Sequence, residues 1–257
     1  MQIYWLEQAE AEVPADDVWL SANEKSIFDA LRLPKRRADW RLGRWTAKQA
    51  VAACLNQPSD LKGLADIEIR AASSGAPDIF IEGRAGPVSI ALSHRNGIAL
   101  CAVGSIEHRF GCDLESVEPR SSAFVDDYFT YTEKNLIQSA SVQHKPELVT
   151  LIWSAKESAL KALREGLRLD TQCVSVAPSA ELQSSNLNAE RWRSMKVDYA
   201  GKRDFSGWWR IEGALVRTIV STQPLEIPVR IQLLHPTAER YAVCGCGASA
   251  LAAPRPS

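Results

Sequence analysis

The sequence lacks the features that mark several large classes of protein. No apolar run among its 257 residues approaches the roughly 18 residues that a membrane-spanning helix needs, so a membrane protein is not expected. The formal net charge is only -1, which gives no global attraction to nucleic acid or to an anionic membrane surface. Any anion site must therefore come from a local cluster of Lys and Arg.

Cysteines are few and scattered. Four of the six stand alone in the sequence, and only Cys244 and Cys246 are close together. Two thiols are too few for a zinc site, which needs about four ligands, and the pattern favours a reducing compartment. Residues 1–14 carry three glutamates and lack the basic and apolar stretches of a secretory signal. We therefore expect a cytoplasmic protein.

Two common catalytic motifs are also missing. The sequence contains no G-x-x-x-x-G-K-[ST], which argues against an ordinary kinase or NTPase. It contains no G-x-S-x-G either, which argues against a serine hydrolase. What remains is an ordinary composition, 46% hydrophobic and 24% charged, in a chain long enough for one large core or two modest ones.

The order of the predicted elements suggests two lobes, because helices followed by strands occur twice. In the first half we expect helices at 21–33 and 35–55, then a small antiparallel sheet from strands at 67–70, 79–81, 88–92 and 98–103. In the second half we expect a strand at 111–115, a capped helix from Thr130, a helix at 145–164 ending near Gly166, and strands at 196–199, 208–211 and 241–244.

This order predicts an α+β fold of two similar, pseudo-dimeric lobes, each a small, mostly antiparallel sheet packed with a long helix. We place the N-terminal lobe at 1–106, the C-terminal lobe at 107–247 and a tail at 248–257. Similarity between the halves is too weak to predict a sequence repeat. A cleft between two lobes is a favoured place for a ligand.

Two charged clusters carry the chemistry. Asp113 and Glu115 are two residues apart in a predicted strand, so both carboxylates project from one face. Glu157 and Lys161 are four apart in a predicted helix and also share a face. Either pair alone is more often ordinary surface charge than a site. Together, the three carboxylates and the ammonium group would suit a Mg²⁺ ion and a polyphosphate.

A basic face on the helix at 35–55 is the local concentration of positive charge that an anion site requires. Arg37, Arg41, Arg44 and Lys48 recur at spacings of three and four residues, and Asp39 is almost their only acidic neighbour. A solvated helix surface is the plain alternative, but such surfaces usually mix both signs. This face is therefore a candidate anion site.

The clusters resemble the signature pair of the 4'-phosphopantetheinyl transferases. Gly-Cys-Asp-Leu-Glu at 111–115 is followed about forty residues later by Trp153-x-x-Lys156-Glu157-Ser158-x-x-Lys161. The segments Ile-Ala-Leu-Ser-His at 90–94 and Phe-Thr-x-x-Glu at 129–133 are similar to two further segments of that family, in the same order. The chain length fits the larger, single-chain Sfp-type group.

The resemblance implies an activity and two partners. Such an enzyme transfers the phosphopantetheine arm of coenzyme A to a serine of an apo acyl or peptidyl carrier protein, and releases adenosine 3',5'-bisphosphate. By resemblance, Asp113, Glu115 and Glu157 bind Mg²⁺, while Glu157 and Lys161 are the catalytic residues. Lys161 would also contact phosphate as charge builds on the leaving group. Glu157 and a metal-bound water are both candidate bases for the acceptor serine.

Further contacts to coenzyme A also follow from the resemblance. Ser93 and His94 would contact its phosphates, and we favour Arg44 and Lys48 for the 3'-phosphate. One turn departs from the family, which often has a basic residue between Gly and Pro, whereas this chain has Ala76. Either a backbone contact suffices there, or a residue such as Arg84 compensates, or affinity is lower.

Two other functions remain as alternatives. A different Mg²⁺-dependent phosphotransferase or pyrophosphatase would use the same carboxylates without a carrier protein. A non-catalytic protein that binds coenzyme A or a carrier would keep the fold, but it has little need of the full acidic set. Because two lobes in one chain can build the whole cleft, we expect a monomer.

Overall fold

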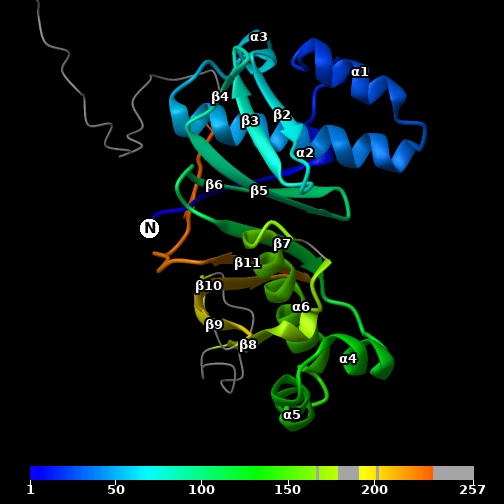
Figure 1. Ribbon diagram of the computed structural model, residues 1–257. Coiled ribbons are helices and arrows are strands. Elements are labelled where there is room, and N and C mark those ends of the chain that lie inside the picture. Colours follow the sequence, from blue (N-terminus) through cyan, green and yellow to red (C-terminus); the bar gives the residue numbers. More distant parts are fainter. Residues whose placement is uncertain (166–167, 179–190, 201–202, 234–257) are drawn as a thin grey trace, which may run out of the picture.

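The computed structural model describes residues 1–165, 168–178, 191–200 and 203–233, which form two lobes, one above the other in Figure 1. Both lobes combine helices with antiparallel sheet, as the α+β prediction requires. The strand predicted at 241–244 and the tail at 248–257 lie outside the described residues. Within the ranges just given, no helix has both the length and the apolar character needed to cross a bilayer.

The first lobe is built on a 22-residue helix, α2, which packs against a sheet of order β12-β1-β6-β5. A second sheet, of order β2-β3-β4, lies beside it. The elements of this lobe are β1 (Tyr4–Ala9), α1 (Ala22–Ala30), α2 (Pro34–Leu55), α3 (Leu61–Ala65), β2 (Ile67–Ala71), β3 (Pro77–Ile81), β4 (Arg84–Ala85), β5 (Val88–Arg95) and β6 (Ile98–Ser105), with a 3-10 turn at Glu10–Glu12.

One prediction for this lobe was wrong. The four strands expected in one small sheet belong to two different sheets, because β5 and β6 pair with each other and β6 pairs with β1 instead of with β2 or β3. β6 is buried along most of its length, so both of its edges need a strand partner. The sequence pattern of each strand indicates its existence but carries no information about which strand lies next to it.

The second lobe has a single antiparallel sheet of order β7-β11-β10-β9-β8, covered by helix α6. Its elements are β7 (Phe110–Ser116), α4 (Ser122–Tyr128), α5 (Tyr131–Ser139), α6 (Lys145–Ala162), β8 (Val174–Pro178), β9 (Arg193–Tyr199), β10 (Arg203–Glu212) and β11 (Leu215–Ser221), with a 3-10 turn at Thr171–Cys173. Sequence reasoning missed α4 and β11. Ser121, which caps α4 by accepting a hydrogen bond from the backbone N–H of Phe124, was the available signal.

The division into residues 1–106 and 107–247 stays a prediction, with one amendment. The two-residue strand β12 (Val229–Arg230) pairs in parallel with β1, so the chain returns to the first lobe after completing the second. The segment around β12 therefore belongs to the sheet of the first lobe.

Each lobe contains a buried Lys–Glu ion pair at an equivalent position. Residues 45–48 of α2 read Trp-Thr-Ala-Lys and residues 153–156 of α6 read Trp-Ser-Ala-Lys. Lys48 is fully buried and pairs with Glu24 at 2.5 Å, and Lys156 is fully buried and pairs with Glu133 at 2.9 Å. Each glutamate belongs to the capping box of the shorter helix that precedes the long helix of its lobe. Glu24 lies in α1, which precedes α2, and Glu133 lies in α5, which precedes α6.

The surroundings of the two pairs also match. Glu24 accepts a hydrogen bond from the backbone N–H of Ile69 at the start of the following sheet, and Glu133 accepts one from Val176 in the same way. Each lysine donates to two backbone carbonyls of its own lobe, Trp19 and Leu64 in one case and Thr171 and Val174 in the other. The pseudo-dimeric fold is thus confirmed, and the structure shows a correspondence of single residues that was too weak to predict from the sequence.

Strand β7 lies where the two lobes meet. Its residues Cys112 and Leu114 join a third apolar core, between the lobes, that also contains Trp5 and Leu100. Cys112 is buried on the face opposite the carboxylates, and burial raises the pKa of its thiol to about 12. The alternate residues of β7 face α6, so the acidic face of the strand looks toward the helix that carries the second motif.

Glycine at position 111 is required by the close approach of α6 to β7. A Cβ atom there would lie 2.1 Å from the backbone oxygen of Ser158 and 2.7 Å from the Cβ of Lys161. Gly111→Ala is therefore expected to lower the free energy of unfolding by about 2–3 kcal/mol, because the helix must shift to admit the methyl group. Chemical denaturation followed by circular dichroism measures this loss.

Gly43→Ala in α2 is the matched control, because a Cβ there would meet nothing within 4 Å. It should be neutral or stabilise the protein by about 0.5–1 kcal/mol, the usual gain for alanine over glycine inside a helix. Equal stability of Gly111→Ala and the parent protein would contradict the close approach.

Candidate active site

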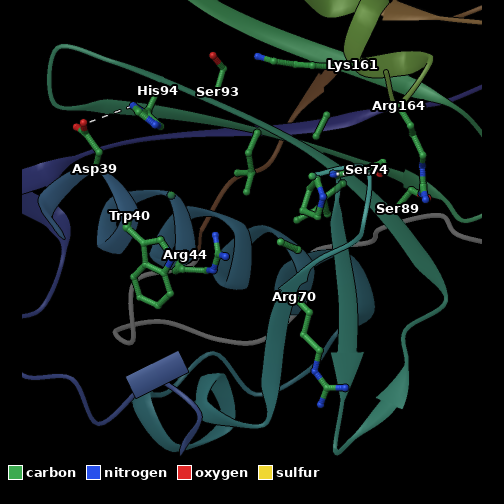
Figure 2. Close-up of a pocket in the computed structure, with 18 of the residues that line it drawn as sticks. Asp39, Trp40, Arg44, Arg70, Ser74, Ser89, Ser93, His94, Lys161 and Arg164 are labelled. Carbon is green, nitrogen blue, oxygen red and sulfur yellow. Dashed lines mark hydrogen bonds and ion pairs between the residues drawn. The ribbon is translucent and has the colours of Figure 1, made fainter. Parts of the chain in front are cut away.

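A cavity of about 640 Å³ lies between the lobes, beside the acidic face of β7 (Figure 2). Its walls come from α2, β5, the turn between β2 and β3, the segment before β7 and the end of α6. The uncharged part of the lining is the larger one, but its charged and titratable residues are basic except for Asp39: Lys35, Arg36, Arg44, Arg70, Arg109, Lys161, Arg164 and the histidines His94 and His108. Such a wall suits a ligand that carries several negative charges.

Asp113 is held by groups from both lobes. Lys161 donates to its Oδ1 at 2.8 Å from the end of α6, and the hydroxyl of Ser93 donates to the same atom at 2.8 Å from β5. Lys161 also donates to the carbonyl of Cys112 at 3.0 Å. Lys161 therefore forms its salt bridge with Asp113 of β7 instead of with Glu157 along the helix. Lys161 is thus fixed at the border between the carboxylates and the cavity.

Glu115 is positioned by an aromatic side chain of α6. The indole N–H of Trp153 donates to its Oε1 at 3.3 Å, and the guanidinium groups of Arg95 and Arg120 lie 3.6 and 3.7 Å from its Oε2. Trp153 also packs against Phe124, with ring centroids 5.0 Å apart. Trp153 therefore packs against the apolar core of the second lobe and also orients a carboxylate.

Glu157 is half-buried on α6 and faces the other two acids. Burial raises the pKa of its carboxyl group, Lys161 opposes that shift, and the negative charges of Asp113 and Glu115 add to it. Burial likewise raises the pKa of Glu115, again with a contribution from Asp113. The three carboxylates therefore share one electrostatic environment and repel one another there.

His94 stands at the other side of the cavity, about half exposed at the end of β5. Its Nδ1 lies 3.9 Å from Asp39, the dashed contact in Figure 2, and Asp39 in turn accepts a hydrogen bond from Lys35 at 2.6 Å. Burial lowers the pKa of His94, and the nearby carboxylate of Asp39 only partly offsets this. Ser93, the preceding residue, lines the cavity as well.

Arg44 is the one residue of the predicted basic face that lines the cavity. Its guanidinium carbon lies 4.7 Å from the ring centroid of Trp40, and Figure 2 shows the group directed into the open space. Burial lowers the pKa of Arg44, with Glu24 opposing the shift from 3.9 Å. A buried guanidinium with so distant a partner is suited to accept an anionic ligand.

The assignment of Lys48 to coenzyme A was wrong. Its ammonium group is fully buried in the core of the first lobe, bonded to Glu24 and two carbonyls, and it does not line the cavity. Arg37 and Arg41 are also engaged elsewhere, because they donate to backbone carbonyls of α1 and of residues 14–16. Helical spacing shows which residues share a face but not what that face contacts.

Several cavity residues were missed by sequence reasoning. His108 had no motif around it, yet it lines the cavity, as do Arg36 and Arg109. The turn with Ala76 also lines the cavity, whereas Arg84, suggested as its replacement, does not. Adjacent basic residues at 35–36 and 108–109 were visible in the sequence, but no pattern connected them to the distant motif residues.

Comparisons with known proteins agree with this geometry. A family model described as the 4'-phosphopantetheinyl transferase superfamily matches residues 109–208. The 4'-phosphopantetheinyl transferase HetI of a Nostoc species is 26% identical over 186 residues, or 70% of this chain and 76% of that protein. A holo-[acyl-carrier-protein] synthase of Streptococcus agalactiae is 32% identical over 84 residues, or 33% of this chain and 71% of the synthase. The chain belongs to the 4'-phosphopantetheinyl transferase superfamily.

A solved structure, of the Helicobacter pylori holo-[acyl-carrier-protein] synthase in complex with coenzyme A, also matches. It covers 40% of this transferase and 99% of its own chain at 18% identity, with a TM-score of 0.28. The residues matched by the family model include β7 and α6 and therefore all three acidic residues and Lys161.

The acidic residues of the transferase have the donor chemistry that a hard divalent cation requires. Asp113 Oδ2 and Glu115 Oε2 are both buried and accept no hydrogen bond from the described residues. Carboxylate oxygens are the ligands that Mg²⁺ prefers. A cation would compensate Asp113 Oδ2 most, because Arg95 and Arg120 already lie near Glu115 Oε2. In the described part of the chain, however, no three acidic, His or Cys side chains converge closely enough to form a ready metal site.

Proposed function

We propose that this transferase moves the 4'-phosphopantetheine arm of coenzyme A to a serine of an apo carrier protein, with Mg²⁺, and releases adenosine 3',5'-bisphosphate. One observation carries the proposal: buried carboxylate oxygens of β7 lie beside a cavity in which every charged lining residue except Asp39 is basic. A pyrophosphate bound at this border would have Lys161 on one side and the acidic set on the other. The Sfp-type assignment is consistent with this arrangement and stays a prediction.

Asp113, Glu115 and Glu157 would hold the cation. Bound Mg²⁺ would neutralise charge on the pyrophosphate of coenzyme A and make its β-phosphorus easier to attack. Ser93 and Lys161 orient Asp113 by donating to one of its oxygens, which leaves the other oxygen available. Trp153 does the same for Glu115 through Oε1. These contacts fix the directions of two carboxylates before any ligand binds.

Lys161 would stabilise the leaving group. Its ammonium group is already charged and fixed by two hydrogen bonds, so it needs little reorganisation as negative charge develops on the bisphosphate. Arg44 and His94, from the other wall, would contact the nucleotide end of coenzyme A. Phosphates would thus be bound from both lobes.

A pyrophosphatase or another phosphotransferase is less well supported. The basic residues of the cavity lining extend from Lys35 on α2 of one lobe to Arg164 beyond α6 of the other. That extent suits a ligand with phosphates at two separate places, as coenzyme A has. A purely binding protein would not need three carboxylates that repel one another.

Incubation of the purified protein with coenzyme A, Mg²⁺ and a panel of apo carrier proteins is expected to add the phosphopantetheine arm to at least one carrier. Intact-protein mass spectrometry measures the addition, and a carrier with the acceptor serine changed to alanine is the control. Hydrolysis of coenzyme A without any carrier would favour the pyrophosphatase instead. Failure to modify any carrier, in folded protein that binds coenzyme A, would count against the transferase activity.

We further propose that the enzyme acts as a monomer in the cytoplasm. The cavity is built from the two lobes of one chain, so no second copy is needed to complete it. Cys101, Cys112 and Cys173 are free thiols, which suits a reducing compartment.

A further inference from the structure

Helix α6 ends in an unusual way. The sequence predicted its end near Gly166, but the helix stops at Ala162, and Arg164 adopts a left-handed backbone conformation with φ of 61°. The backbone N–H of Glu165 donates to the carbonyl of Leu160, and that of Arg164 donates to Lys161. This hydrogen-bond pattern is the Schellman motif, whose left-handed position is usually Gly and sometimes Asn.

The first lobe contains the same turn with a favoured residue. At the end of α2, Asn56 has φ of 52°, and the N–H groups of Asn56 and Gln57 donate back to Ala53 and Ala52. Asn56 follows Lys48 by eight residues, as Arg164 follows Lys156, so the two positions correspond in the repeat. An arginine at this position is strained, and a strained residue needs a reason elsewhere in the molecule.

The side chain of Arg164 reaches the cavity. Figure 2 shows it extending from the end of α6 toward Ser74 and Ser89, on the side away from His94. Its one described ion pair is a loose contact of 3.6 Å to Asp78, with both side chains more than a third exposed. Asp78 belongs to β3 of the first lobe, so the pair links the two lobes next to the cavity.

We propose that Arg164 is a binding residue for the nucleotide half of coenzyme A, and that Asp78 holds its guanidinium in place until the ligand arrives. The proposal rests on the proposed function, because it takes coenzyme A as the ligand. The proposal also accounts for Ala76, which stands in the Gly-x-Pro turn where the family often has a basic residue. Arg164 supplies a positive charge to this cavity wall from the second lobe. The charge is supplied at a cost in backbone strain.

Arg164→Gly separates this role from a structural one. Glycine is the favoured residue for the turn, so the variant should melt at the same temperature as the parent or higher. Its KM for coenzyme A should rise about tenfold with little change in kcat, as expected when a charge-assisted hydrogen bond to the ligand is lost. Inhibition by adenosine 3',5'-bisphosphate should weaken by a similar factor, and calorimetry with coenzyme A measures binding without turnover.

Three controls sharpen the test. Arg164→Lys keeps the charge without the planar fork and should give an intermediate KM. Asp78→Asn removes the carboxylate that competes with the ligand for this guanidinium and should tighten the binding of coenzyme A. Asn56→Arg puts the same strain in the first lobe, outside the cavity, and should lower the melting temperature without changing KM.

An unchanged KM and unchanged calorimetric affinity in Arg164→Gly would overturn the proposal, and so would a marked loss of stability in that variant. Absence of transfer by the parent protein would instead contradict the proposed function. The two failures are therefore distinguishable.

Discussion

Asp113→Ala is expected to reduce the rate of transfer to a carrier protein by about 10²–10³-fold or more, while the protein stays folded. Asp113 connects the two lobes, because Ser93 of the first lobe and Lys161 of the second both donate a hydrogen bond to its carboxylate. Its loss removes an oxygen ligand for the cation and also releases Lys161 from its fixed position. Single-turnover transfer followed by mass spectrometry measures the rate.

A second measurement tests the cation role without turnover. Saturating Mg²⁺ together with coenzyme A should raise the melting temperature of the parent protein, because a ligand that binds only the folded state stabilises it. The additional effect of Mg²⁺ should vanish in Asp113→Ala. Asp126→Ala, which alters an exposed acid on α4 of the same lobe, should behave like the parent. Full activity of Asp113→Ala would remove Asp113 from the metal set.

Lys156→Met is expected to cause the largest loss of stability, about 3–5 kcal/mol in the free energy of unfolding. The substitution leaves Glu133 buried without its cation and leaves the carbonyls of Thr171 and Val174 without a donor. A loss of that size corresponds to a fall of roughly 10 °C in melting temperature for a chain of this length. Urea denaturation monitored by fluorescence measures it.

The double variant Glu133→Gln with Lys156→Met should recover part of that stability. A neutral amide at position 133 no longer carries a buried charge, and its oxygen can still accept the hydrogen bond from Val176. Lys48→Met should be destabilised to a similar extent, because Lys48 makes the same contacts in the first lobe. A cost below about 1 kcal/mol for both lysines would refute the structural role assigned to them.

The signature residues were predictable because their spacing has a direct geometric meaning. Two residues along a strand and four along a helix put side chains on one face, and that local rule holds whatever the rest of the chain does. The capped helix start at Thr130 was found for the same reason, because its capping partner is three residues away. Local rules therefore gave the long helices, the acidic face of β7 and the face of α6 that meets it.

Lys48 shows where such rules stop. In the sequence it continues the basic stripe of Arg37, Arg41 and Arg44, and nothing local distinguishes it from them. In the structure it lies in the core beside Glu24, a residue of another helix. The similar segments Trp-Thr-Ala-Lys and Trp-Ser-Ala-Lys were the one available signal in the sequence. They imply that Lys48 and Lys156 have equivalent surroundings in the two lobes.

By itself, the sequence determined the two-lobed α+β order, the acidic and basic clusters and the resemblance that connects them to phosphopantetheinyl transfer. Only the tertiary structure decided which cations face the cavity, which strands are neighbours, that Ser93 and Lys161 converge on Asp113, and that Arg164 occupies a strained turn beside the cavity. The physical reason is the range of the interactions. Periodicity records contacts within one element, whereas partners that are 20 or 48 residues apart are brought together only by packing of the lobes.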